Sequence, residues 1–341
     1  MAENTTERKT LLEVKDLHTF FTTRRGIVKA VNNTSYSIKE GETLGVVGES
    51  GSGKSVSAMS ILRLLDGNGY IDSGEILFNG RDLTKISLEE MYHIRGNEIS
   101  VIFQEPMTSL NPVFTVEKQL SECFMVHQNM DKKEAAEHSL EMLRDVKIPN
   151  PEIVAKQYPH QLSGGMRQRV MIAMALACKP KILIADEPTT ALDVTIQAQI
   201  LKLMNELKRE HGTAILFITH DLGVINQMAD NVAVMYCGQV VETAPREVIF
   251  DPNCTHSHPY TEALMYSIPR LDTPTGTRLD AIPGAVPHPL DLPKGCKFAP
   301  RCKYATDRCR EAEPPMAVIN EHQQIRCYYP NIEERKNGKF E

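Results

Sequence analysis

The stretch Gly48-Glu49-Ser50-Gly51-Ser52-Gly53-Lys54-Ser55 decides the fold of this chain, because its spacing, G-x-x-x-x-G-K-S, is that of a phosphate-binding loop. Glycines let a backbone curl until successive N–H groups point into one concavity, which attracts an anion. Lys54 would bring a positive charge to the β- and γ-phosphates, and Ser55 would offer a hydroxyl to Mg²⁺. The stretch therefore predicts binding of a nucleoside triphosphate such as ATP.

The flanking residues agree with this interpretation. The short apolar run 43–47 is typical of a buried strand, and the residues from Val56 to Leu65 favour a helix. The dipole of such a helix would point its positive end at the bound phosphates. A chance glycine turn is the alternative, and a strand before the loop with a helix after it argues against that alternative.

Composition limits the classes of protein to consider. The chain has 341 residues, of which 41% are hydrophobic and 24% charged, as in ordinary globular proteins. No apolar run approaches the roughly 18 residues that cross a bilayer, and residues 1–10 lack the apolar core of a secretion signal. We therefore expect a cytosolic chain. Its net charge of −6 disfavours a dedicated nucleic-acid binder.

The pattern along the chain predicts an α/β fold. It combines a mixed β core, an antiparallel β subdomain, an inserted helical subdomain at about 105–178, and a small cysteine-rich C-terminal extension. Expected strands cover residues 11–21 (an edge strand), 30–38, 75–78, 99–103, 182–186, 213–219 and 231–242, and expected helices cover 132–147, 195–210 and a stretch from 164 onward. We place one domain at 1–270 and the extension at 271–341.

Five further motifs narrow the class of protein. Residues 162–166 form a second glycine turn that opens a helix, and Asp186-Glu187 ends an apolar strand with two adjacent carboxylates. Gln104 and His220 each follow another strand, and residues 191–193 end in Asp193. In order and spacing, residues 11 to about 245 resemble the ATP-binding cassette family. The resemblance implies a P-loop ATPase of that family, in which the turn Ser163-Gly164-Gly165-Met166 closes over ATP held by a partner subunit.

The residue types suit ATP hydrolysis, which needs charge neutralisation and an aligned water. Asp186 would hold Mg²⁺ together with Ser55 and Gln104. Glu187 would orient or deprotonate the attacking water, and the resemblance makes His220 the group that contacts the γ-phosphate. An N-cap with a solvated neighbour is the alternative for the carboxylate pair, and a strand-end histidine satisfied by backbone is the alternative for His220.

The sequence gives a weaker indication of which residues contact the adenine base of the nucleotide. The family usually places an aromatic residue at the end of the first strand, which here is Phe21, and Val28 would pack beside it. Phe20 or Phe21 as ordinary core residues is the competing interpretation.

Three longer segments, at 104–112, 158–169 and 258–261, resemble the ATPases of oligopeptide/dipeptide permeases, and Met166 is typical of their D-type subunit. The resemblance implies a subunit at the cytoplasmic face of the plasma membrane. Its partners would be an F-type ATPase, two membrane subunits and an extracytoplasmic binding protein. Peptides are the expected cargo, although some relatives move nickel, glutathione or oligosaccharides.

The tail holds four cysteines, Cys296, Cys302, Cys309 and Cys327, at spacings C-x5-C-x6-C-x17-C. Four thiolates in a small, loop-rich segment are a possible metal site. The resemblance implies a [4Fe-4S] cluster, the spacing equally allows Zn²⁺, and unliganded thiols are the third alternative.

The surface that meets the membrane subunits is expected at residues 106–114, although the apolar residues Met107, Leu110, Val113 and Phe114 suit a core equally well. Two other classes compete with the transport interpretation. A soluble cassette ATPase acting on nucleic acid or ribosomes is disfavoured by the single cassette and the lack of a long heptad insertion. A regulatory module that binds ATP without turnover is disfavoured by Glu187 and His220.

Overall fold

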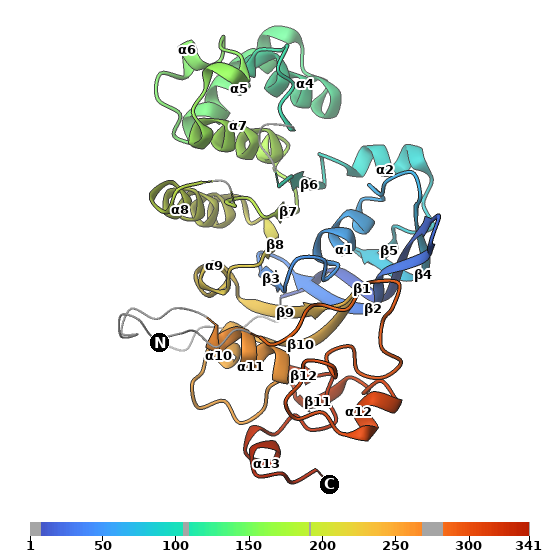
Figure 1. The fold of residues 1–341 in the computed structure, drawn as a ribbon. Helices are drawn as coiled ribbons and strands as arrows, with labels where there is room; N and C mark the ends of the chain where they lie inside the picture. Colours follow the sequence, from blue (N-terminus) through green and yellow to red (C-terminus); the bar gives the residue numbers. More distant parts are fainter. Residues whose placement is uncertain (1–7, 105–108, 191, 268–281, 341) are drawn as a thin grey trace. The chain divides into compact units, whose positions relative to one another are not determined.

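The structure is a computed structural model that describes residues 8–104, 109–190, 192–267 and 282–340 (Figure 1). The chain divides into two compact units, each built from segments far apart in the sequence. Unit 1 comprises Met1–Leu11, Ile38–Thr43 and Lys85–Ile218, and unit 2 comprises Leu12–Ser37, Leu44–Thr84 and Thr219–Glu341. Within the described part of the chain, no helix has the length and apolar character needed to cross a membrane.

Unit 2 contains an antiparallel sheet with the order β2-β1-β4-β5. Its strands are β1 (Thr10–Thr23), β2 (Gly26–Lys39), β4 (Gly69–Phe78) and β5 (Arg81–Asp82). The prediction of an edge strand at 11–21 is wrong, because β1 lies between β2 and β4. The predicted strand at 75–78 is only the end of β4, whose full length pairs with β1 from Leu12 to Phe21.

The second sheet of unit 2 has the order β11-β12-β10-β9-β3. Its strands are β3 (Thr43–Val47), β9 (Asn231–Tyr236), β10 (Gln239–Pro245), β11 (Ala317–Asn320) and β12 (Gln323–Ile325). The single strand expected at 231–242 is a hairpin. Cys237 and Gly238 both have positive φ (45° and 78°), which is the geometry of a tight hairpin turn. The apolar residues on both sides hide this turn from a periodicity argument.

The phosphate-binding stretch joins two elements of unit 2. Every residue of β3 is buried, as predicted for its apolar sequence, and α1 (Lys54–Ile61) begins directly after Gly53. The other helices described in unit 2 are α9 (Leu222–Met228), α10 (Arg246–Ile249), α11 (Pro259–Tyr266), α12 (Asp307–Glu311) and α13 (Ile332–Lys336).

Unit 1 is built on three neighbouring parallel strands, β6 (Ile99–Ile102), β7 (Ile182–Asp186) and β8 (Ala214–Thr219). The predicted strands at 99–103, 182–186 and 213–219 are confirmed to within a residue at each end. The helix α2 (Leu88–Ile94) precedes β6, and the helix α8 (Val194–His211) follows β7. Because the strands are parallel, their carboxyl ends meet at one edge of the sheet, where such sheets bind ligands.

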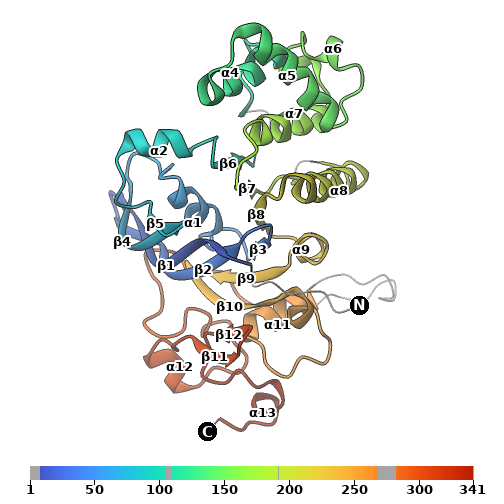
Figure 2. The same cartoon turned by 180° about the vertical axis from the view of Figure 1, so that it is seen from behind.

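The chain between β6 and β7 is largely helical where the structure describes it (Figure 2). It forms α4 (Val116–Gln128), α5 (Lys132–Asp145), α6 (Pro151–Val154), a 3₁₀ turn at Pro159–Gln161 and α7 (Gly164–Leu176). The helix expected at 132–147 is α5, whose start is fixed by a capping box between Asp131 and Glu134. α4, α5 and α7 pack against one another around buried Leu120, Leu143 and Val170.

Candidate functional site

The phosphate-binding loop of unit 2 is closed around its lysine. Lys54 is 5% exposed, and its Nζ donates to the carbonyl oxygens of Gly48 (2.7 Å) and Glu49 (3.0 Å). The backbone of Ser52 also donates to the Glu49 carbonyl (3.2 Å), which tightens the curl. The ammonium group therefore lies at the centre of the loop and at the N-terminus of α1, where an anionic ligand is stabilised.

Two glycines of this loop are required by close backbone approach. A Cβ on Gly48 would lie 2.1 Å from the carbonyl oxygen of Met235 on β9. A Cβ on Gly53 would lie 2.4 Å from the carbonyl oxygen of Ala30, and Gly53 has a φ of 94°, which side chains rarely adopt. The loop is thus seated directly on the backbone of neighbouring strands. Of the other predicted loop residues, Ser52 is buried, Ser55 and Val56 are half-buried, and Ser50 and Gly51 are exposed.

The predicted adenine residues lie on β1 and β2. Phe21 is half-buried, and its ring occupies the space that a Cβ on Gly69 would need, 2.6 Å away. Phe20 is buried and meets Tyr70 edge to face at 6.3 Å. Val28 is half-buried. Phe20 is therefore the packed member of the pair, and stacking of the base on Phe21 stays a prediction.

Unit 1 brings two predicted site residues together at the carboxyl ends of β6 and β7. Gln104 Nε2 donates to Glu187 Oε2 (3.1 Å), and the Thr190 hydroxyl donates to the same oxygen (2.9 Å). Glu187 has a φ of 47°, and its N–H donates to the carbonyl of Ile218 (2.9 Å). A left-handed glutamate is a strained conformation, and such strain collects at functional sites. The Glu187 carboxylate is held in this position by the side chains of Gln104 and Thr190.

Two further predicted residues of unit 1, Asp186 and Asp193, lie at the end of a strand and at the start of a helix. Asp186, at the end of β7, is 6% exposed. The cap of α8 is Asp193, whose Oδ1 accepts from the N–H of Ile196 (3.0 Å), so neither Asp186 nor Glu187 is an N-cap. Ala191, beside this motif, lies outside the described residues.

The second glycine turn begins α7. Ser163 caps this helix through a hydrogen bond from the N–H of Met166 (3.3 Å). Gly164 and Gly165 open the helix, and a Cβ on Gly165 would lie 2.9 Å from Cγ2 of Ile196 on α8. The absence of a side chain at Gly165 therefore lets α7 approach α8 closely. His220, in unit 2, follows β8 and is exposed.

Comparisons with known proteins agree with these motifs. Residues 31–190 match the ABC transporter family, and residues 241–309 match the C-terminal region of oligopeptide/dipeptide transporters. The oligopeptide transport ATP-binding protein AppD of Bacillus subtilis (strain 168) is 51% identical over 321 residues, which cover 94% of this chain and 96% of that protein. The chain belongs to the ATP-binding cassette transporter family.

Further relatives support the same family. The dipeptide transport ATP-binding protein DppD of Escherichia coli (strain K12) is 48% identical over 320 residues, covering 94% of this chain and 97% of that protein. A solved dimeric ATP-binding cassette in a post-hydrolysis state, bound to ADP and Pi, is 29% identical with a TM-score of 0.63. The structural match covers 69% of this chain and 99% of the solved chain. The P-loop cassette fold expected from the sequence is therefore confirmed.

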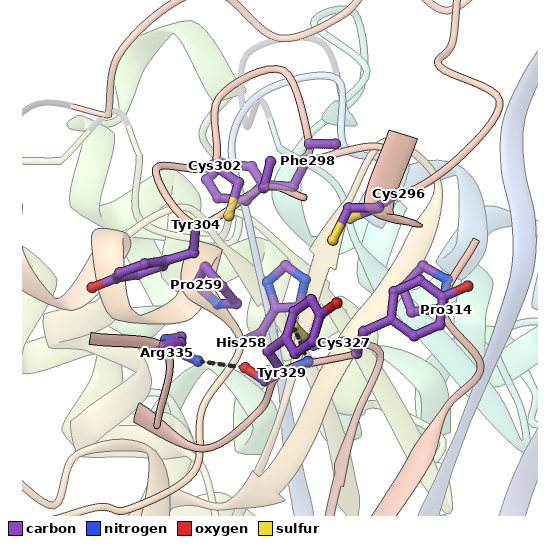
Figure 3. A pocket seen from close by; sticks show the side chains of 14 residues that line it. His258, Pro259, Cys296, Phe298, Cys302, Tyr304, Pro314, Cys327, Tyr329 and Arg335 are labelled. Carbon is purple, nitrogen blue, oxygen red and sulfur yellow. Dashed lines mark hydrogen bonds between the residues drawn. The ribbon is translucent and has the colours of Figure 1, made fainter. Parts of the chain in front are cut away.

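The iron–sulfur interpretation of the tail is wrong. Cys296, Cys302, Cys309 and Cys327 line one pocket, and Figure 3 shows Cys302 and Cys296 along its upper edge with the His258 ring below and between them. Among the described residues, however, no group of three or more His, Cys, Asp or Glu side chains is arranged to hold a metal ion. None of these four cysteines forms a disulfide in the described part of the chain.

The free space beside these thiols is small, and the thiols themselves are buried. The pocket has a free volume of about 20 Å³, which is room for about one water molecule and not for a cluster of iron and sulfide. Burial raises the pKa of Cys302 to about 11 and that of Cys327 to about 12, because desolvation disfavours the charged thiolate. Close spacing in the sequence thus reflects a shared packing environment.

A buried histidine beside this pocket makes the stability of unit 2 depend on pH. His258 is 1% exposed, and its Nδ1 accepts from the N–H of Tyr260 (3.0 Å) at the start of α11. Burial, followed by the charges of Arg335 and Arg326, lowers the pKa of His258 to about 3. The unfolded chain takes up a proton near pH 6.5 and the folded chain does not, so the stability contributed by neutral His258 is lost as the pH falls from about 6.5 toward 3.

We expect the unfolding free energy to fall between about pH 7.5 and 5.5 by about 1.4 kcal/mol more in the unsubstituted chain than in a His258→Asn variant. Asparagine keeps an acceptor at the N-cap but does not titrate in this range. Urea unfolding at the two pH values measures the difference. Equal losses in both proteins would contradict the assignment of a neutral buried His258.

Proposed function

We propose that this chain is the ATP-hydrolysing subunit of an importer of oligopeptides or dipeptides. The observation that carries the proposal is the pair of built sites in one chain, a lysine-centred phosphate-binding loop in unit 2 and a strained glutamate aligned with Gln104 in unit 1. Relatives named as oligopeptide and dipeptide transport ATP-binding proteins, at about half identity over nearly the full chain, support the peptide cargo.

Each of the predicted site residues has a separate role in the proposed hydrolysis of ATP. The loop amides and Lys54 bind the phosphates, and Asp186 with the Ser55 hydroxyl offers the hard oxygen ligands that suit Mg²⁺. Mg²⁺ would neutralise the negative charge that develops on the phosphates during transfer. Glu187 orients or deprotonates the attacking water, while Gln104 holds its carboxylate in place. His220 is proposed to contact the γ-phosphate.

Partners follow from the same proposal. The turn at 163–166 would cap ATP held by a second ATPase subunit, which we propose to be the F-type subunit of the importer. Two membrane subunits would hold the pair at the cytoplasmic face of the plasma membrane, and a binding protein would deliver the peptide.

The helical insertion offers apolar surface for the membrane subunits. In it, Val113 is 68% and Val126 64% exposed, whereas Leu110 is 2% exposed and belongs to the core. Phe114 is half-buried, with Lys118 Nζ 3.6 Å from its ring centroid, and Met107 lies outside the described residues. We propose that Val113, rather than Leu110, meets the membrane subunits.

Uptake in a cell that lacks only this chain tests the proposed cargo. We expect loss of uptake of labelled dipeptides or longer oligopeptides, and its recovery when the chain is restored. Restoration with a chain carrying Glu210→Gln, an exposed residue of α8, provides the matched control and should work equally well. Normal peptide uptake with loss of nickel, glutathione or oligosaccharide uptake would overturn the peptide assignment.

A further inference from the structure

The C-terminal extension reaches the phosphate-binding loop through one arginine. Arg301 Nη1 donates to Glu49 Oε2 (2.6 Å), and Nη2 donates to Glu49 Oε1 (3.1 Å), which is a two-point pairing of guanidinium and carboxylate. Arg301 is 7% exposed and is itself held by the carbonyl of Pro283 (2.9 Å). The pair is therefore shielded from solvent on the arginine side and half-exposed on the glutamate side.

The backbone of the same glutamate is held by a second side chain. The N–H of Glu49 donates to the hydroxyl of Tyr260 (2.8 Å), at the start of α11. The Tyr260 ring is fully buried and packs against Tyr236 (4.7 Å between centroids) and Phe298 (5.4 Å). Glu49 is thus fixed through both its side chain and its main chain, by residues outside the loop.

The charge of Glu49 makes this pairing relevant to the ligand. The Glu49 carbonyl accepts from Lys54 Nζ (3.0 Å), so the glutamate is adjacent to the group that would meet the phosphates. An unpaired carboxylate on this loop residue would place a negative charge beside the proposed phosphate site and would weaken binding of a triphosphate through like-charge repulsion. Arg301 neutralises that carboxylate, and the loop keeps a net attraction for the anion.

We propose that Arg301 is a positioning residue for nucleotide binding, which neutralises Glu49 and fixes the curl of the phosphate-binding loop. The proposal rests on the proposed function, because it takes ATP as the ligand of that loop. It assigns to the C-terminal extension a role in ATP affinity that needs no metal in the cysteine pocket.

The test measures the dissociation constant for MgATP in the purified full-length chain, by calorimetry. Arg301→Met should weaken binding by about tenfold, because the guanidinium is lost and Glu49 stays charged. Adding Glu49→Gln to Arg301→Met should restore affinity to within about threefold of the unsubstituted chain, since the repulsive charge is then gone. Arg301→Lys, which keeps the charge but not the two-point geometry, should fall between these values.

A matched control separates this role from general destabilisation. Arg335 is also buried in the extension, where it pairs with Glu262, and its hydrogen bonds in the described part of the chain go to residues outside the loop. Arg335→Met should lower the melting temperature without changing the affinity for MgATP. Equal weakening by Arg335→Met, normal affinity of Arg301→Met, or a double variant as weak as Arg301→Met would each overturn the inference. Failure of the unsubstituted chain to bind MgATP would instead overturn the proposed function.

Discussion

Replacing Glu187 by glutamine should reduce ATP hydrolysis by the assembled complex by at least about a hundredfold, the usual effect of losing a general base. Glutamine keeps the volume of the side chain and can still hydrogen-bond Gln104, so the geometry at the ends of β6 and β7 should survive. It cannot take a proton from water, and it removes the negative charge. ATP binding should therefore persist while turnover stops.

The measurement pairs the hydrolysis rate with retention of labelled ATP on the same complex. Glu210→Gln, an isosteric change on the exposed face of α8, is the control and should leave both quantities unchanged. Unchanged hydrolysis in the Glu187→Gln complex would refute the assignment of Glu187 as the catalytic base.

Replacing Lys54 by methionine should weaken MgATP binding by about a hundredfold, because charge-assisted hydrogen bonds to phosphate are lost and the buried loop gains no other cation. Lys54 already bridges two loop carbonyls, so its loss would also relax the curl that aligns the amides. Unlike Glu187→Gln, this change should therefore lower both the affinity for MgATP and the hydrolysis rate.

Lys15→Met provides the control for charge alone. Lys15 lies on β1 of the same unit, and its side chain is 47% exposed beside Glu13. In a titration with a fluorescent ATP analogue, the Lys15→Met variant should bind the analogue as tightly as the unsubstituted chain does. An affinity for Lys54→Met within threefold of that value would argue that the loop does not hold the phosphates.

The features that the sequence predicted well are those with local physical causes. Apolar runs of five or six residues specify buried parallel strands, so β7 was predicted to the residue and β8 to within one. Gly48 and Gly53 are required because the loop backbone lies against the carbonyl groups of Met235 and Ala30. The sequence motif specifies glycine at both of these positions. Such signals need no knowledge of distant partners.

The errors came from tertiary context. Nothing local in β1 indicates that β4 will cover its second edge, and the turn at Cys237-Gly238 is flanked by apolar residues on both sides. The cysteine spacing suggested a metal site, whereas burial of protonated thiols beside aromatic rings satisfies the same pattern.

The tie between Glu49 and Arg301 spans 252 residues, and no periodicity could have revealed it. The contact of the Tyr260 hydroxyl with the Glu49 N–H likewise joins residues that are far apart in the sequence. Long-range polar pairs of this kind require coordinates.

The most direct test of the central claim is the ATP hydrolysis rate of the complete importer in lipid vesicles, measured with and without peptide-loaded binding protein. Loaded binding protein should stimulate hydrolysis and drive peptide accumulation, and the Glu187→Gln complex should show neither response. A rate that is the same with and without loaded binding protein, and the same in both complexes, would contradict the central claim.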